Sequence, residues 1–318
     1  MTERRLIQVA DLELPCLDVR GELDGPHLCL IAGIHGCEYS SIAAVRRFAC
    51  ALDPARLAGS VTAVPIVNLP SYWARSPFVS PADGKNLNRC FPGNLEGTYS
   101  DVLAHDVFER LIAPSDYLVD LHGGDMVEGL EPFALYDESR VEETAREMAI
   151  AFGLPYVMRL ERAGAPVGGT TSAAAAAAGI PAVIAEAGGR GLLEEAAVEL
   201  HVRGLENVLR RLDMLDGDPE PPQAGMRSVA RFVWLRSSAA GWWEPFADAG
   251  AEVGEGALLG TVSDLFGDVL EEISAPEAGV LLFVTTSPAV GEGGLLLGLG
   301  AGVEALTSNG DDTAGSVR

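Results

Sequence analysis

Lysine is almost absent from this sequence. Lys85 is the single lysine among 318 residues, and 22 basic residues stand against 46 acidic ones, for a net charge of −24. A surface this acidic repels nucleic acid and anionic membranes, so we expect neither as a partner. A small anionic substrate would need a local group of arginines to overcome the same repulsion.

Long apolar runs, paired cysteines and a serine-nucleophile motif are also missing. No segment approaches the roughly 20 uncharged residues of a membrane helix, and the N-terminus is too polar for a secretory signal. The five cysteines form no Cys-x-x-Cys pair, and their odd number argues against a disulfide framework. No Gly-x-Ser-x-Gly elbow occurs, which disfavours a serine hydrolase. We therefore expect a cytoplasmic protein in which most of the cysteines are buried free thiols.

The first two thirds of the chain alternate strand-like and helix-like segments. Strands are predicted at His27–Ile34, Val61–Val67, Tyr117–Leu121, Tyr156–Leu160 and Pro181–Ala185. Helices are predicted at Glu38–Ala51, Asp101–Ile112, Glu142–Phe152, Ser172–Ala178 and Leu192–Leu215. Pro65 suggests an edge position or a bulge for its strand, and Asn68–Gly97 is predicted to be a long loop. The alternation predicts an α/β sheet flanked by helices.

The last third has a different pattern. An acidic, proline-rich linker at Asp216–Gln223 is followed by short strands between glycine turns. These strands are predicted at Ser228–Leu235, Ala257–Val262, Gly279–Val284 and Gly294–Leu299. We divide the chain into a catalytic α/β domain at 1–220, a small β domain at 221–306 and a disordered tail at 307–318.

Two of the predicted strands lead into histidines. One is followed by Gly-Ile-His-Gly-Cys-Glu (residues 33–38), and the other ends in Asp-Leu-His-Gly-Gly (residues 120–124). Sites in α/β sheets gather at the carboxyl ends of strands, and catalytic zinc often takes a His₂Glu set plus water. We therefore predict one zinc ion per chain, bound by His35, Glu38 and His122.

Asp120 and the other three histidines are the remaining residues whose role must be assigned. Asp120 either orients His122 from behind or caps a turn as a buried aspartate. His27, His105 and His201 are predicted to be packed or surface histidines without a catalytic role.

A third strand end carries Glu186, within Pro-Ala-Val-Ile-Ala-Glu-Ala-Gly-Gly (residues 181–189). An unpaired carboxylate after an apolar strand is unfavourable. Beside zinc, it can serve as the general base that takes a proton from water and passes it to the leaving group. The alternative is a surface glutamate in a turn.

The predicted long loop contains Asp-Gly-Lys-Asn-Leu-Asn-Arg-Cys-Phe-Pro-Gly (residues 83–93). Arg89 offers a fork of donors that suits a carboxylate, and Asn88 adds an amide donor. Arg75 lies upstream in the same loop. We predict that Asn88, Arg89 and Arg75 bind substrate, while solvated loop arginines are the alternative.

These motifs together resemble the succinylglutamate desuccinylase/aspartoacylase family of zinc hydrolases, which are relatives of the zinc carboxypeptidases. The matching signatures occur in the family's order at 33–38, 86–93, 120–124 and 185–189. The resemblance implies a carboxypeptidase-like mixed sheet, zinc on His35, Glu38 and His122, and Glu186 as the catalytic carboxylate.

The resemblance also extends to the substrate and to the last third of the chain. It implies that Asn88 and Arg89 hold the substrate carboxylate or polarise its acyl oxygen, and that the reaction cleaves a small N-acyl amino acid or amine. The segment after residue 225 is similar to a lipoyl/biotinyl-type barrel. Because that segment contains no lysine, a shielding or assembly role is expected rather than a lysine-modified carrier.

One departure from the family bears on the substrate. Dicarboxylate-specific members add an arginine shortly before the catalytic glutamate, whereas Gly164–Ala185 contains none. This difference argues against aspartoacylase or succinylglutamate activity, and favours the bacterial deacylases that act on acetylated diaminobutyrate in ectoine breakdown. The candidates for a substitute are Arg75, Arg159, Arg162 and Arg190.

The sequence thus supports a zinc-dependent deacylase. The alternatives are a zinc carboxypeptidase that acts on short peptides and a catalytically silent metal-binding or interaction protein. The acyl group, the amine and any homo-oligomeric assembly stay open.

Overall fold

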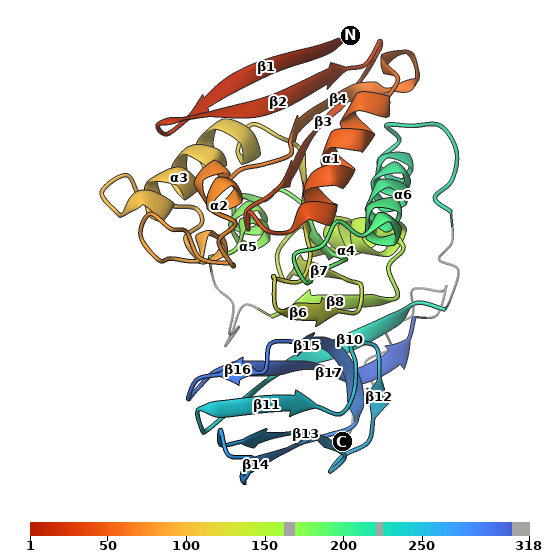
Figure 1. Cartoon of the computed structure of the whole chain (residues 1–318). Helices are drawn as coiled ribbons and strands as arrows, with labels where there is room; N and C mark the ends of the chain where they lie inside the picture. Colours follow the sequence, from red (N-terminus) through yellow and green to blue (C-terminus); the bar gives the residue numbers. More distant parts are fainter. Residues whose placement is uncertain (162–168, 221–224, 307–318) are drawn as a thin grey trace.

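The computed structural model describes residues 1–161, 169–220 and 225–306 (Figure 1). The predicted tail 307–318 and Arg162 lie outside the described residues. Among the residues that are described, no helix is long and apolar enough to cross a bilayer.

One large mixed sheet runs through the molecule. Its strands, in spatial order, are β1 (Thr2–Val9), β2 (Leu12–Arg20), β4 (Ala58–Val64), β3 (Leu23–Ala32), β5 (Tyr117–His122), β9 (Ala182–Glu186), β7 (Phe133–Asp137), β8 (Tyr156–Leu160), β10 (Arg227–Arg236), β17 (Leu295–Ala305), β15 (Gly279–Thr285) and β12 (Glu252–Val253), with β6 (Glu128–Leu130) paired to β15.

The centre of this sheet is parallel and buried on both faces. Strands β4, β3, β5 and β9 run in the same direction, whereas β7 pairs antiparallel with β9 and makes the sheet mixed. In β3, Leu28 and Leu30 pack in one hydrophobic core, and Cys29 and Ile31 pack in another. A strand buried on both faces reads as a continuous apolar run, which is why the sequence reveals it.

Helices cover both faces of the sheet. One layer consists of α1 (Tyr39–Ala51), α4 (Glu142–Phe152) and α6 (Glu195–Arg211), and its apolar residues join one core. The other layer consists of α3 (Tyr99–Val107) and α5 (Thr171–Ala178), with the short helix α2 (Leu69–Ala74) nearby (Figure 1). The mixed α/β architecture predicted from the sequence is confirmed.

Several predicted boundaries shift for local reasons. The helix at Glu142–Phe152 has the predicted bounds, whereas the last predicted helix is shorter and begins at Glu195. The strand predicted at Val61–Val67 ends at Val64, and it lies between β2 and β3. The edge position expected from Pro65 is therefore wrong. An interior position is possible because the proline follows the strand and so removes no ladder hydrogen bond.

Other elements are found only in the structure. The helix predicted at Asp101–Ile112 consists of α3 and a single π turn, Phe108–Ile112, and the predicted loop Asn68–Gly97 contains α2 and the 3₁₀ turn Leu87–Arg89. The hairpin β1–β2 and strand β7 carry no prediction. Most of β1 is exposed at the edge of the sheet, so its sequence lacks the apolar pattern of a buried strand.

The C-terminal strands form two layers. Strand β10 pairs in parallel with β8 and antiparallel with β17, so the large sheet continues past residue 226. A second sheet consists of β14 (Val269–Ser274), β13 (Leu258–Ser263), β11 (Gly241–Pro245) and β16 (Ala289–Val290). Trp243 and Leu259 of the second sheet share a core with Leu281 and Leu297 of the first. The division at residue 220 stays a prediction.

Candidate active site

The predicted site residues come from the ends of neighbouring parallel strands. His122 is the last residue of β5, Glu186 is the last residue of β9, and the two are directly paired in the ladder. His35 follows β3, which lies on the other side of β5. Gly33 makes the turn out of β3 at a φ of 65°, where a Cβ would lie 2.9 Å from the backbone of Ile66. This tight turn brings His35 back over the end of the sheet.

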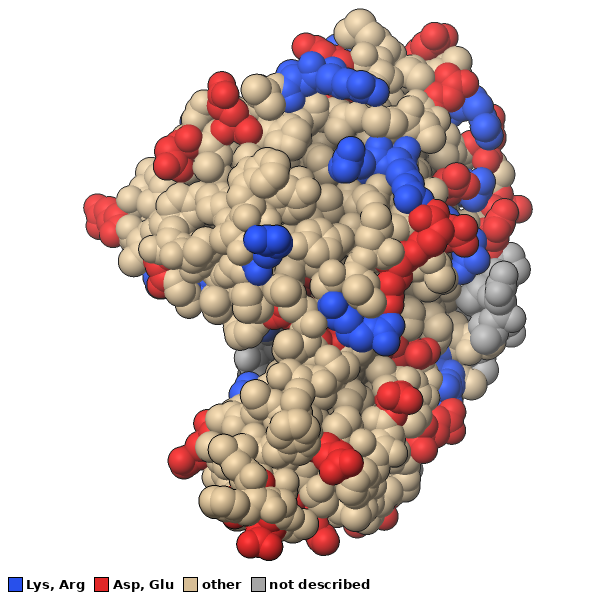
Figure 2. Space-filling model, viewed as in Figure 1, with Lys and Arg blue, Asp and Glu red and all other residues tan. Residues whose placement is uncertain are grey.

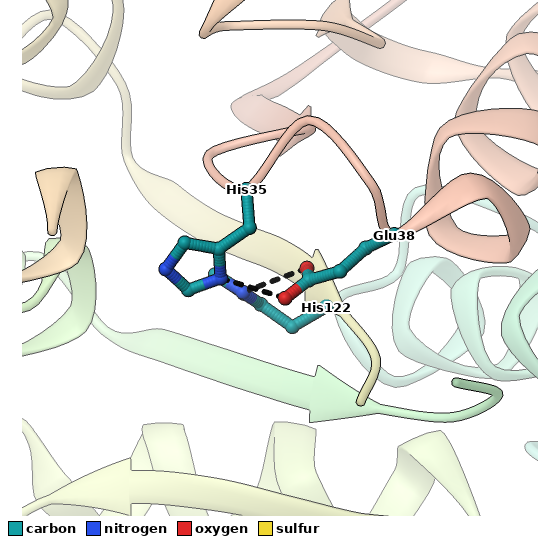
Figure 3. Close-up of side chains that lie close together, drawn as sticks. All are labelled: His35, Glu38 and His122. Atoms are coloured by element: carbon teal, nitrogen blue, oxygen red, sulfur yellow. Dashed lines mark hydrogen bonds and ion pairs between the residues drawn. The ribbon is translucent and has the colours of Figure 1, made fainter. Parts of the chain in front are cut away.

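Three side chains converge at this sheet end (Figure 3). His35 Nδ1 lies 2.6 Å from Glu38 Oε1, and His122 Nδ1 lies 3.1 Å from Glu38 Oε2. One ligand atom from each residue falls within 4.8 Å of the other two. Glu38 and His122 are buried, and His35 is half-buried. The group is the right size and chemistry to hold one metal ion.

The outer nitrogens of both imidazoles face hydrogen-bond acceptors. His35 Nε2 lies 3.0 Å from Asn86 Oδ1, and His122 Nε2 lies 2.9 Å from Asp120 Oδ2. Asn86 Oδ1 also accepts the backbone N–H of Asn88 at 2.8 Å, which fixes the orientation of the amide. Each Nε2 must therefore donate.

Each inner nitrogen, Nδ1, therefore faces the Glu38 carboxylate. A lone pair on Nδ1 so close to a carboxylate oxygen is unfavourable unless a cation or a proton lies between the two atoms. Burial opposes the ionisation of Glu38, but His35 and His122 outweigh it and lower its pKa to about 2. The site is thus built to stabilise positive charge, as a His₂Glu metal site requires.

Asp120 is fully buried and orients His122 from behind. Its Oδ2 accepts from the Thr171 hydroxyl at 2.5 Å, and the Thr171 backbone N–H donates to Asn88 Oδ1 at 3.0 Å. Burial alone would lower the pKa of His122, but Asp120 and Glu38 raise it well above its usual value. Of the two interpretations of Asp120, the contact favours the orienting one. Thr171, which links Asp120 to Asn88, is a site residue that the sequence did not reveal.

The Asp120 contact gives a testable prediction. Asp120→Asn should weaken zinc binding by about 10- to 100-fold, because the partner of a metal-binding histidine fixes its tautomer and raises its basicity. Competition with a fluorescent zinc chelator measures the affinity. Asp116→Asn, an exposed change just before the same strand, is the matched control. Equal affinities for both variants and the parent would contradict the orienting role.

His201 proves to be a packed histidine of α6. It is fully buried, and its Nε2 donates to the backbone carbonyl of His122 at 3.1 Å. Burial lowers its pKa to about 4, so the ring is neutral and supports the backbone of His122. In the sequence, the position of His201 on one face of an amphipathic helix was the signal that could have indicated its burial.

A cavity of about 1070 Å³ opens beside the cluster. Asn88, Arg89 and Glu186 all line it, together with His35 and His122. Arg89 donates to the Asn88 carbonyl at 2.7 Å. Burial lowers the pKa of Arg89, although the nearby Glu186 acts in the opposite direction. Desolvation of its carboxyl group raises the pKa of Glu186 to about 8, which suits a group that must hold and release a proton.

Arg75 does not join this group in the described part of the chain. It ends α2 in the left-handed conformation with an exposed side chain, and it is not among the residues that line the cavity. Arg190 likewise faces away and pairs with Glu194 at 2.5 Å. Arg159 does line the cavity, but Glu142 holds it at 2.9 Å.

The C-terminal strands add residues that the sequence motifs could not indicate. Arg231 and Arg236 of β10 line the same cavity. Arg231 pairs with Glu277, and Arg236 donates to the Gly293 carbonyl at 3.0 Å. No motif links them to the metal cluster, because only the pairing of β10 with β8 brings these residues to the cavity.

The loop after His122 is tied to the loop around His35. Asp125 accepts from the Cys37 thiol at 3.1 Å and from the backbone N–H of Phe78 at 3.0 Å. Glu128, the first residue of β6, lines the cavity, and burial raises its pKa to about 7. These contacts fix the distance between the two histidine-bearing segments.

A mixed sheet whose parallel strands end in a His₂Glu group beside a cavity is an arrangement typical of metal-dependent hydrolases. The chain belongs to the succinylglutamate desuccinylase/aspartoacylase family: the model of that family's catalytic domain matches residues 24–212. The match covers every candidate residue named from the motifs.

Individual relatives agree with this assignment. N-alpha-acetyl-L-2,4-diaminobutyric acid deacetylase of Halomonas elongata is 32% identical over 253 residues, which cover 77% of this chain and 72% of that protein. The succinylglutamate desuccinylase/aspartoacylase of Rhodobacter sphaeroides superposes with a TM-score of 0.81 at 26% identity and covers 96% of this chain and 95% of that one. The product-bound ectoine utilization protein EutE (DoeB) of Ruegeria pomeroyi gives 0.81 at 26% identity, with 94% of each chain covered.

Proposed function

We propose that this protein is a zinc-dependent deacylase that hydrolyses the amide bond of a small N-acyl amino acid or N-acyl amine. The observation that carries the proposal is the group of ligand atoms from His35, Glu38 and His122, all within 4.8 Å of one another, in the cavity that Glu186 also lines. The deacetylase relative and the family match support a hydrolase.

His35, Glu38 and His122 are the residues that would hold the metal. A His₂Glu set with imidazole nitrogens and one carboxylate fits zinc better than magnesium or calcium, which prefer oxygen ligands. Zinc, when bound, supplies a Lewis acid and lowers the pKa of water toward about 7. Asp120 and Asn86 keep the imidazoles in the tautomer that such binding needs.

Glu186 moves the proton. Its carboxylate takes a proton from the water that attacks the acyl carbon, and then gives that proton to the amide nitrogen as the C–N bond breaks. The products are a carboxylate and a free amine. The raised pKa of this carboxyl group, caused by desolvation, stabilises the protonated form that delivers the proton to the amide nitrogen.

Asn88 and Arg89 bind the substrate. Arg89 is a partly solvent-exposed cation that lines the cavity, and it can hold the carboxylate of an amino acid or the oxyanion that develops on the acyl oxygen. Arg75 is not part of this set, because its side chain does not line the cavity. For the amine, we favour a diamino acid, in keeping with the substrate named for the Halomonas elongata relative.

The two-part organisation belongs to the same proposal. Residues 1–220 would form the catalytic domain, and 221–306 a lipoyl/biotinyl-like barrel that covers the cavity. The residues of β10 and β15 that line the cavity support a covering role. The surface is hollowed between the two parts (Figure 2).

A substrate panel tests the function. Zinc-loaded protein should release acetate from N-acetyl-2,4-diaminobutyrate at least 100-fold faster than it releases the terminal residue of blocked dipeptides, with products detected by mass spectrometry. Preference for the dipeptides would instead indicate a carboxypeptidase. One zinc per chain without hydrolysis of any compound would indicate a silent metal-binding protein.

A further inference from the structure

One region of the cavity is aromatic. It is lined by four aromatic side chains, which we call the aromatic wall: Phe133, Phe232, Trp234 and Phe283. Phe133 belongs to β7 of the α/β part, whereas the other three belong to β10 and β15 of the C-terminal strands. Two separate stretches of the chain thus build one surface.

The wall is rigid because it lies on paired strands. In β10, Phe232 and Trp234 face the cavity, while the intervening Val233 and Leu235 pack in the core between the two C-terminal sheets. This alternation follows the period of a strand. The centroid of the Phe232 ring lies 4.7 Å from the ring centroid of Trp234 and 5.8 Å from that of Phe283. The rings support one another and are held in place without substrate.

The wall is continuous with the proposed catalytic group. Phe133 pairs with Glu186 across the β7–β9 ladder, and its ring lies 6.3 Å from that of Phe232.

The size of the cavity indicates more than an acetyl group. Its volume of about 1070 Å³ is slightly above the roughly 300–1,000 Å³ of typical pockets for drug-sized ligands. An acetylated diamino acid would fill the polar end, near Asn88 and Arg89, and leave the aromatic wall uncovered. Exposed apolar surface of this kind favours an apolar ligand group.

We propose that the aromatic wall binds the acyl group of the substrate, and that the preferred acyl group is an apolar chain longer than acetyl. The assignment rests on the proposed deacylase function, in which Arg89 and Asn88 hold the amino-acid part at the polar end. The acyl chain then extends from the reacting carbon along Phe133 toward Phe232 and Trp234.

A chain-length series tests this assignment with the unaltered zinc-loaded protein. Acetyl, butanoyl and hexanoyl amides of 2,4-diaminobutyrate are compared by kcat/KM. Each methylene that the wall buries should raise kcat/KM by about fourfold, so butanoyl should exceed acetyl by roughly tenfold or more. A second series keeps the acetyl group and places apolar side chains on the amine. A rise confined to this second series would overturn the assignment to the acyl group.

Variants of the wall show whether these residues cause the preference. Phe232→Ala and Trp234→Ala should each lower the hexanoyl-to-acetyl ratio of kcat/KM by about tenfold, because the chain loses its contact surface. Trp242→Ala is the control, since Trp242 lies on β11 with half of its surface exposed and does not line the cavity. The control should keep the parent's ratio.

The outcomes separate this proposal from the function itself. Hydrolysis of the acetyl substrate with a flat or falling chain-length profile would overturn the role of the wall and leave the deacylase intact. Absence of hydrolysis for every acyl amide would refute the function. A rising profile that persists in Phe232→Ala and Trp234→Ala would also overturn the role of the wall.

Discussion

Glu186→Gln should lower kcat by about 10²- to 10⁴-fold, the usual contribution of a positioned general acid–base group. Glutamine has nearly the same shape as glutamate but cannot take a proton from water or return one to the amide nitrogen. Glu186 is not in the His35, Glu38 and His122 group, so we expect the variant to bind one zinc per chain. We therefore expect turnover to fall while the zinc content stays at one per chain.

The measurement pairs single-turnover kinetics with metal analysis of the same samples. Glu199→Gln serves as the control, because Glu199 is an exposed residue of α6 and the change removes the same charge. It should keep the parent's rate and zinc content. If Glu186→Gln retained more than about a tenth of the parent's kcat, proton transfer by Glu186 would be excluded.

Much of the site was predictable because its residues follow buried parallel strands. The apolar runs before His35, His122 and Glu186 are visible in the sequence, and parallel neighbours end at one edge of the sheet. The spacing of His35 and Glu38 is local, so it too can be read directly. The coordinates bring these residues together as expected, while their chemical roles stay predictions.

The remaining parts of the site depend on contacts between distant segments. His201 supports His122 from 79 residues away, and Phe232 reaches Phe133 only because β10 pairs with β8. Sequence periodicity shows that β10 is apolar on both faces, but it does not show which face lines a cavity. Arg75 shows that the opposite error is also possible: it is near Arg89 in the sequence, but it does not line the cavity.

Removal of the metal should abolish activity, and one equivalent of zinc should restore it. Each of the two Nδ1 atoms lies within 3.1 Å of the Glu38 carboxylate, so the ligands are already gathered and zinc should also stabilise the fold. Binding stabilises the native state by about 2.7 kcal/mol when free zinc is 100-fold above Kd. A rise in Tm on zinc addition measures this stabilisation independently of activity. The absence of a rise would argue against a preorganised metal site.

Glu38→Gln tests whether this stabilisation comes from the proposed ligands. The loss of one ligand should weaken zinc binding by more than about 100-fold, because even the partners behind a ligand contribute about 10- to 100-fold. The zinc-dependent rise in Tm and the activity should therefore disappear together. Glu143→Gln, an exposed change on α4, should retain both. Since Glu38 is the carboxylate that both Nδ1 atoms face, undiminished zinc binding by Glu38→Gln would mean that the metal lies elsewhere.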